Sequence, residues 1–189
     1  MELTPQAIYE QSIDKQRIVI TGSERSKLGG IITTILNKYQ RKFDHFANGQ
    51  LTSLPSSPII IIESPISHTI LGYKHHVAIL TNASETELTD LMKFADATPK
   101  SGTIFYPETD PKLKSIGSKE RADIQSIPYK VIPHEVKDGK TILVSSTGEK
   151  FPIQLSGNQN LLLLAVAKDL LKKIGISSGQ FYKAIATIT

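Results

Sequence analysis

The 189-residue chain contains no cysteine and no tryptophan. Without cysteine it can form neither a disulfide nor a zinc site with thiolate ligands, and it has no cysteine nucleophile. No apolar run approaches the roughly 18 residues that a membrane-spanning helix needs. The N-terminal segment is too polar for a secretory signal. We therefore expect a cytoplasmic protein without membrane contact.

Aromatic residues make up only 6% of the chain, and its basic residues are not clustered. The 22 basic and 18 acidic residues give a formal net charge of +4, but the positive residues are scattered, at most in pairs such as Lys172 and Lys173. A nucleic-acid-binding surface combines clustered Lys and Arg with exposed aromatic rings. We therefore expect no nucleic-acid partner.

The five histidines do not have the spacing of a metal site. Their spacing does not converge metal ligands on one helix face, and adjacent residues such as His75 and His76 in a strand point to opposite sides. The sequence also lacks the G-x-S-x-G pattern that positions a serine nucleophile. These absences argue against a histidine metal cluster and against a serine hydrolase.

Four apolar runs predict strands that are covered on both faces, as in a parallel sheet. They occupy 17–21, 58–63, 76–82 and 102–107. Helical patterns lie between the strands, and two of them have clear starts: Ser84 and Glu87 have capping-box spacing, and Asp110 and Pro111 suit an N-cap and a first turn. The alternation predicts an α/β fold with a mostly parallel sheet and flanking helices.

A different pattern begins at about residue 127 and ends at about 155. Short strands are joined there by the turn signals DGK at 138–140 and TGE at 147–149, which predict a small antiparallel sheet. Two amphipathic helices follow, and Gly175 is placed to end the first of them. The leucine run at 161–164 is most simply the buried start of this helix, and if exposed it would mark a homodimer contact. We expect residues 1–189 to form one domain.

Four segments resemble the central, ATP-binding domain of the Mur ligases. They are VITGS at 19–23, IIIIES at 59–64, AILTN at 78–82 and the segment 153–188, which begins IQLSGNQN. The sequence is most similar to the ligases that join L-alanine or a murein tripeptide to UDP-N-acetylmuramate. The resemblance implies a P-loop-like α/β domain from peptidoglycan synthesis or recycling, with ATP and Mg²⁺ as cofactors. The flanking UDP-sugar and C-terminal domains of those ligases are expected to be absent from this chain.

The resemblance places a phosphate loop at residues 22–27. The family's loop reads Gly-Thr/Ser-x-Gly-Lys-Thr/Ser, in which backbone N–H groups and the lysine hold phosphate and the hydroxyl holds Mg²⁺. Gly22 and Ser23 match this pattern, whereas Arg25 replaces the second glycine. Ser26 takes the lysine position, and Lys27 falls one place late. The candidate nucleotide-binding residues in this loop are therefore Gly22, Ser23, Ser26 and Lys27.

The resemblance also implies a metal ligand and an adenine contact. Glu63 stands where the family has a magnesium ligand, but the further acidic residues that follow it in the family are missing, so it is also explained as an ordinary strand-end glutamate. Thr86 and Glu87 replace an Asp-His pair. Asn160 matches an asparagine near adenine and is equally well explained as a helix cap, while Gln159 replaces the adjacent histidine.

We predict a stand-alone, degenerate Mur ligase central-domain homologue without catalytic residues, a pseudoenzyme with a binding or scaffold role. The missing glycine, lysine and carboxylates each remove a separate contribution to catalysis. The alternative is the ATP-binding component of an ATP-dependent ligase that joins an amino acid or peptide to UDP-N-acetylmuramate by a C–N bond. In that case separate chains supply the other ligase domains.

Overall fold

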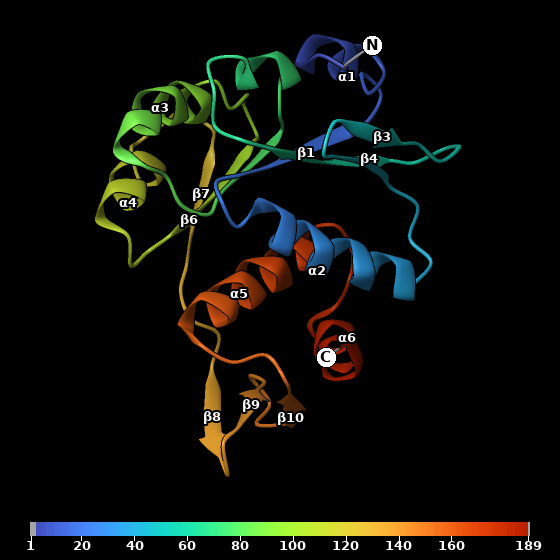
Figure 1. The fold of residues 1–189 in the computed structure, drawn as a ribbon, viewed down its shortest axis with the longest axis vertical. Coiled ribbons are helices and arrows are strands. Elements are labelled where there is room, and N and C mark those ends of the chain that lie inside the picture. The colour runs from blue at the N-terminus through green and yellow to red at the C-terminus, as the bar shows by residue number, and fades with distance from the viewer. Residues whose placement is uncertain (1–2, 189) are drawn as a thin grey trace. The chain divides into compact units, whose positions relative to one another are not determined.

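The computed structural model describes residues 3–188 and contains two compact units (Figure 1). Unit 1 consists of Met1–Gly29 and Lys42–Pro128, and unit 2 of Gly30–Arg41 and Tyr129–Thr189. Helix α2, Arg25–Lys38, begins in unit 1 and continues into unit 2.

A seven-stranded sheet has the strand order β3-β2-β4-β1-β5-β6-β7. The pairs β2–β4, β4–β1, β1–β5 and β5–β6 are parallel, and β3 pairs antiparallel with β2. The mostly parallel sheet predicted from the sequence is thereby confirmed. The strands are β1 Gln16–Thr21, β2 Asp44–Ala47, β3 Gln50–Thr52, β4 Ile59–Ser64, β5 Val77–Leu80, β6 Thr103–Pro107 and β7 Gln125–Tyr129.

Strand β1 lies at the point where the order of connection changes direction. The chain adds β2, β3 and β4 on one side of β1 and then β5, β6 and β7 on the other. In open α/β sheets, a crevice forms at such a switch point, outside the carboxyl ends of the strands. The loops after β1, β4 and β5 therefore meet at one edge, and they begin at Gly22, Pro65 and Thr81.

One face of the sheet in unit 1 packs in an apolar cluster. Alternate strand residues such as Val19, Ile62 and Leu80 join Phe94 and Leu113 from helices in this cluster. The predicted capping box of Ser84 and Glu87 is confirmed, and so is the Asp110 N-cap, whose side chain accepts from the N–H groups of Lys112 and Leu113. The helical elements are α1 Pro5–Glu10, η1 Ile70–Tyr73, η2 Glu85–Glu87, α3 Leu88–Asp96 and α4 Pro111–Gly117.

The hairpin formed by β2 and β3 is absent from the sequence-based prediction. Asn48 and Gly49 form its turn with φ values of 52° and 76°. Asn-Gly is the strongest short hairpin signal because both central residues of a type I′ turn need positive φ. The hairpin was missed because its strands have only four and three residues, which is too short for a clear alternation.

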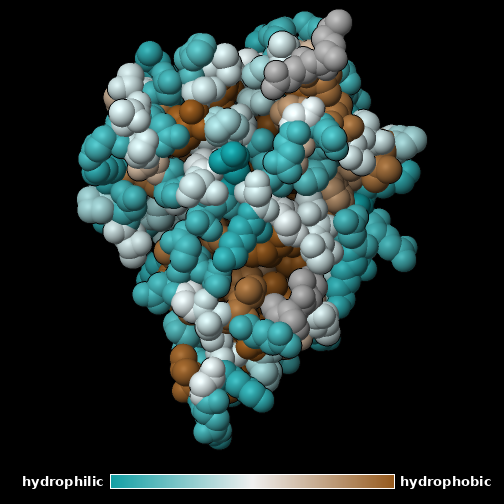
Figure 2. Space-filling model, viewed as in Figure 1, coloured by the Kyte–Doolittle hydropathy of each residue, from teal (hydrophilic) through white to brown (hydrophobic). Residues whose placement is uncertain are grey.

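Unit 2 contains the small antiparallel sheet expected between residues 127 and 155. Its strand order is β10-β9-β8, with β8 His134–Lys137, β9 Lys140–Val144 and β10 Lys150–Ile153. Asp138 and Gly139 have the positive φ values that a tight hairpin turn requires. The β8 side chain of Val136 is 69% exposed, and Figure 2 shows apolar surface where Figure 1 places β8.

Helices α5, Asn158–Lys173, and α6, Ser178–Ile188, complete unit 2. Gly175 follows α5 with a φ of 93°, and reciprocal hydrogen bonds between Ser177 and Gln180 begin α6, as predicted. The leucine run is largely buried: Leu161, Leu163 and Leu164 are at most 2% exposed. Within residues 3–188, no helix combines the length and apolar character needed to cross a membrane.

Candidate functional site

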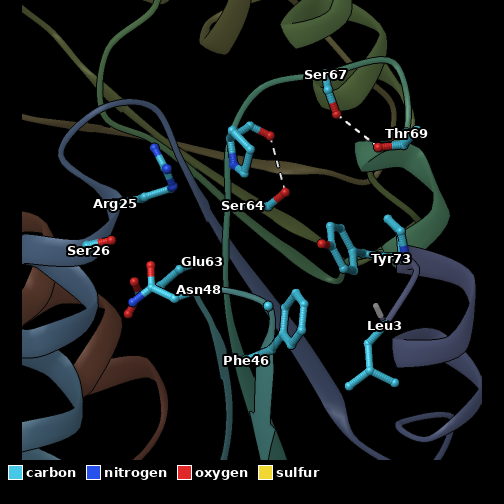
Figure 3. A pocket seen from close by; sticks show the side chains of 13 residues that line it. Leu3, Arg25, Ser26, Phe46, Asn48, Glu63, Ser64, Ser67, Thr69 and Tyr73 are labelled. Atoms are coloured by element: carbon cyan, nitrogen blue, oxygen red, sulfur yellow. Dashed lines mark hydrogen bonds between the residues drawn. The ribbon is translucent and has the colours of Figure 1, made fainter. Parts of the chain in front are cut away.

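The crevice at the carboxyl ends of β1, β4 and β5 holds two neighbouring cavities, both lined by Arg25 and Pro65. The first, here called the hairpin-side cavity, has a volume of about 240 Å³ and reaches the β2–β3 turn at Asn48 (Figure 3). The second, the loop-side cavity, has a volume of about 410 Å³ and is lined by the loops after β1 and β5. All lining residues of both cavities belong to unit 1.

Gly22 begins the loop after β1 in a conformation that only glycine adopts easily. Its φ is 103°, and a Cβ atom there would lie 2.3 Å from Thr81 Oγ1 and 2.6 Å from Asn82 Oδ1. The Thr81 hydroxyl donates a hydrogen bond to the carbonyl of Thr21 at 2.8 Å. The glycine therefore allows the loop to pack directly against the end of β5.

Asn82 binds the backbone N–H and the hydroxyl of Ser23. The Ser23 backbone N–H donates to Asn82 Oδ1 at 2.6 Å, and Asn82 Nδ2 donates to Ser23 Oγ at 2.5 Å. In a phosphate loop, N–H groups in this position face phosphate oxygens. Asn82 stands in the AILTN segment, but sequence reasoning gave it no role, because nothing in the local pattern shows that its side chain reaches across from β5 to the β1 loop.

Arg25 lies in the first turn of α2, and its side chain folds back over the loop. Its Nη1 donates to the carbonyl of Gly22 at 3.0 Å, and the described residues provide no other hydrogen-bond acceptor for the guanidinium. Among the described residues that line either cavity, Arg25 is the sole Lys or Arg. The candidate Ser26 lines the hairpin-side cavity, whereas the candidate Lys27 is exposed and lines neither.

Glu63, the predicted metal ligand, is 7% exposed at the end of β4 and lines the hairpin-side cavity. The Nε2–H of His45 donates to its Oε1 at 2.8 Å. On its other side Glu63 packs against α2 at Gly29, where a Cβ atom would lie only 2.0 Å from Oε1. Within residues 3–188, no group of three or more His, Asp or Glu side chains is arranged to hold a metal ion.

Asn160, the predicted adenine contact, belongs to unit 2 and lies in the first turn of α5. Its Nδ2 donates to the carbonyl of Ser156 at 2.6 Å. Its Oδ1 is buried and has no hydrogen-bond partner among the described residues. The side chain thus makes a local contact at the start of the helix, and a contact with adenine stays a prediction.

The loop-side cavity contains a second carboxylate, that of Glu87. The hydroxyl and backbone N–H of Ser84 donate to Glu87 Oε2 at 2.6 and 2.8 Å. These hydrogen bonds, with a smaller contribution from the charge of Arg25, lower the pKa of Glu87 and keep it ionised at neutral pH. Each cavity therefore carries one carboxylate, and the two cavities share one guanidinium.

Tyr73 and Phe46 form an apolar part of the hairpin-side cavity. Their ring centroids are 6.3 Å apart, and both side chains are largely buried. Burial raises the pKa of Tyr73, against a smaller opposing effect of a hydrogen bond with Ser64, so its hydroxyl stays neutral at physiological pH. The cavity thus combines a charged side with an aromatic side (Figure 3).

Comparison with known proteins finds similarity in solved structures only. No protein-family model and no curated protein matches the sequence. The structure is similar to the UDP-N-acetylmuramate:L-alanyl-gamma-D-glutamyl-meso-diaminopimelate ligase from Neisseria meningitides, with a TM-score of 0.77 and 13% identity over 98% of this chain and 70% of that one.

Two further similar structures come from other ligases. The UDP-N-acetylmuramoylalanyl-D-glutamyl-2,6-diaminopimelate–D-alanyl-D-alanyl ligase from Acinetobacter baumannii gives a TM-score of 0.76 and 13% identity over 98% of this chain and 48% of that one. The folylpolyglutamate synthetase from Lactobacillus casei gives a TM-score of 0.70 and 10% identity over 97% of this chain and 64% of that one. The chain thus spans about half to 70% of these proteins. At such low identity the likeness establishes the fold, which is that of the Mur ligase central domain.

Proposed function

We propose that this chain is a Mur-ligase-type binding or scaffold domain that does not catalyse ATP-dependent ligation. The observation that carries the proposal is the pair of hydrogen bonds between Ser23 and Asn82. An incoming phosphate would have to displace the Asn82 side chain before it could accept a hydrogen bond from the Ser23 N–H. A loop whose N–H donor already has a hydrogen-bond partner within the chain gains less free energy from binding an anion.

The surrounding charges also fit a magnesium–triphosphate complex poorly. Glu63 already accepts a hydrogen bond from His45, and each of the two cavities that Arg25 lines also carries a carboxylate. A triphosphate would meet Glu63 and Glu87 with only one guanidinium in compensation, which costs free energy in a partly enclosed site. No step of a ligation mechanism is therefore assigned to these residues.

The proposal is tested by titrating the protein with ATP and Mg²⁺. Calorimetry and thermal unfolding report binding, and a phosphate-release assay on the same preparation reports turnover. We expect no saturable heat, no rise of the unfolding temperature and no phosphate above the background of a protein-free sample. Tight binding together with phosphate release would refute the proposal.

The same experiment separates the proposal from an ATP-binding ligase component. In that alternative Lys27, exposed in the first turn of α2, contacts phosphate, and Lys27→Ala abolishes the stabilisation that nucleotide produces. Lys42→Ala is a matched control, because Lys42 is also exposed and lines neither cavity. If nucleotide stabilises the native protein and the Lys42 variant but not the Lys27 variant, the ligase component is the better description.

A further inference from the structure

We infer that the hairpin-side cavity binds a small organic monocarboxylate with an apolar body, and that Arg25 recognises the carboxylate. The inference rests on the proposed function, because it assigns to the crevice a ligand other than a nucleotide. It follows from the free edge of the Arg25 guanidinium, from the charge balance of the cavities and from the aromatic side of the hairpin-side cavity.

The Arg25 side chain is held in place by one hydrogen bond, and one full edge of its guanidinium stays available. Nη1 is fixed on the Gly22 carbonyl at 3.0 Å, which restrains the guanidinium. The edge formed by Nε–H and Nη2–H has no partner among the described residues. Two parallel N–H groups on one edge match the two oxygens of a carboxylate, and a restrained donor loses less conformational entropy on binding.

The charge balance limits an anionic ligand at Arg25 to a single negative charge. Arg25 and Glu63 both line the hairpin-side cavity, and Arg25 and Glu87 both line the loop-side cavity. A monoanion at Arg25 gains one strong charge-assisted pair, whereas each further negative charge is added near two carboxylates without another cation. Repulsion therefore selects against phosphate dianions and polyphosphates.

One side of the hairpin-side cavity suits an apolar group of modest size, whereas the rest has a polar lining given by Ser26, Asn48, Ser64, Ser67 and Thr69. Phe46 and Tyr73 provide aromatic surface, and Leu3 and Pro65 extend it. Figure 3 shows Arg25 and Glu63 on one side of the cavity, and Phe46, Tyr73 and Leu3 on the other. A volume of about 240 Å³ lies just below the range of ordinary small-molecule sites. The fit is to a ligand with one ring or one short branched chain.

The first test compares benzoate with benzamide, which has nearly the same shape and no charge, and with inorganic phosphate. Binding to the full chain is followed by calorimetry and by backbone amide shifts in two-dimensional NMR. We expect benzoate to bind more tightly than either of the others and to shift the amides of Arg25, Ser26 and Ser64. Equal binding of benzoate and benzamide, tighter binding of phosphate, or shifts elsewhere would overturn the inference.

The second test uses variants of Arg25. Arg25→Gln removes the charge and keeps an amide donor for the Gly22 carbonyl, so we expect benzoate affinity to fall about tenfold or more. Arg25→Lys restores the charge without the paired edge and is expected to recover only part of the affinity. Lys42→Gln, the matched control, removes an exposed charge outside both cavities, and its effect should stay within about twofold.

The outcomes distinguish failure of this inference from failure of the proposed function. Unchanged benzoate affinity in a folded Arg25→Gln variant overturns the inference alone, as long as ATP is neither bound nor hydrolysed. ATP turnover by the native protein refutes the proposed function whatever benzoate does. If Arg25→Gln does not fold, the comparison of benzoate with benzamide and the shift map on the native protein decide.

Discussion

The Glu63 carboxylate rests directly on the backbone of α2 at Gly29, with no room for a side chain between them. A Cβ atom at Gly29 would lie 2.0 Å from Glu63 Oε1, the same oxygen that accepts the hydrogen bond from His45. The next residue, Gly30, is also inside the helix but has open space around it. Two adjacent glycines in one helix thus have opposite surroundings.

Gly29→Ala is expected to destabilise the protein, because Glu63 must move away and give up its contact with His45. We expect a loss of about 1–3 kcal/mol in the free energy of unfolding. Gly30→Ala is the control and should instead stabilise by up to about 1 kcal/mol, because alanine is the better helix former. Urea unfolding of both variants measures the difference. Equal effects of the two substitutions would show that Glu63 does not rest on Gly29.

Asn82→Ala removes both contacts with Ser23 and is expected to loosen the loop after β1. Because each hydrogen bond contributes about 1 kcal/mol or less at an exposed site, we expect a modest loss of stability, near 1 kcal/mol. The more specific readout is hydrogen exchange, which should become faster at the Ser23 amide. Asn37→Ala, at an exposed position of α2, is the control and should leave that amide unchanged. Unchanged hydrogen exchange in Asn82→Ala would show that Asn82 does not protect the Ser23 amide.

Much of the fold is accessible from the sequence because its signals are local. The four buried strands are marked by apolar runs, the capping boxes of Ser84 and Ser177 by residue spacing, and the end of α5 by Gly175. The β2–β3 hairpin is the exception, since its strands are too short for periodicity and only Asn48-Gly49 marks it. The length of a strand, more than its residue types, decides whether a sequence pattern reveals it.

The site is much less accessible, because its contacts join residues far apart in the sequence. The resemblance of the sequence motifs identifies Gly22, Ser23 and Glu63 as positions but not their hydrogen-bond partners. Asn82 reaches Ser23 from 59 residues away, and His45 reaches Glu63 across 18. In the sequence, Arg25 only stands at the position of the loop's second glycine. The fold is needed to show that it lines both cavities. Pairing across the sheet edge depends on strand order, which local patterns do not encode.

The capping box of Ser84 and Glu87 predicts a specific acid sensitivity. Hydrogen bonds from Ser84 lower the folded-state pKa of Glu87 below its ordinary value of 4.5. Its stabilising contribution is therefore complete above that value and is lost as the pH falls through the lower folded-state pKa. Glu87→Gln should flatten the decline of unfolding free energy in this acid range, and Glu149→Gln, an exposed control, should not. A parallel decline in all three proteins would contradict the prediction.

The buried His75 predicts a loss of stability over a wider range of pH. The ring packs against Phe94 at a centroid distance of 4.0 Å and shares a hydrogen bond of 2.9 Å with the Thr98 hydroxyl. Burial, with smaller contributions from His76 and Arg17, lowers its pKa from 6.5 to about 3. Below pH 6.5 the His75 imidazole binds a proton in the unfolded chain but stays neutral in the folded chain. Unfolding free energy should therefore fall between these two values by up to about 1.4 kcal/mol per pH unit.

His75→Gln removes this proton uptake while keeping a polar group near Thr98, so its unfolding free energy should depend less steeply on pH than that of the native protein. Some dependence should remain, because burial and the charge of Arg17 also lower the pKa of His76. His68→Gln changes an exposed histidine and should retain the native slope. Denaturant unfolding at a series of pH values from 7 to 4 measures all three proteins. An unchanged slope in His75→Gln would mean that the folded protein accommodates a charged imidazole at this position, and that water or a counter-ion reaches the ring between Phe94 and Thr98.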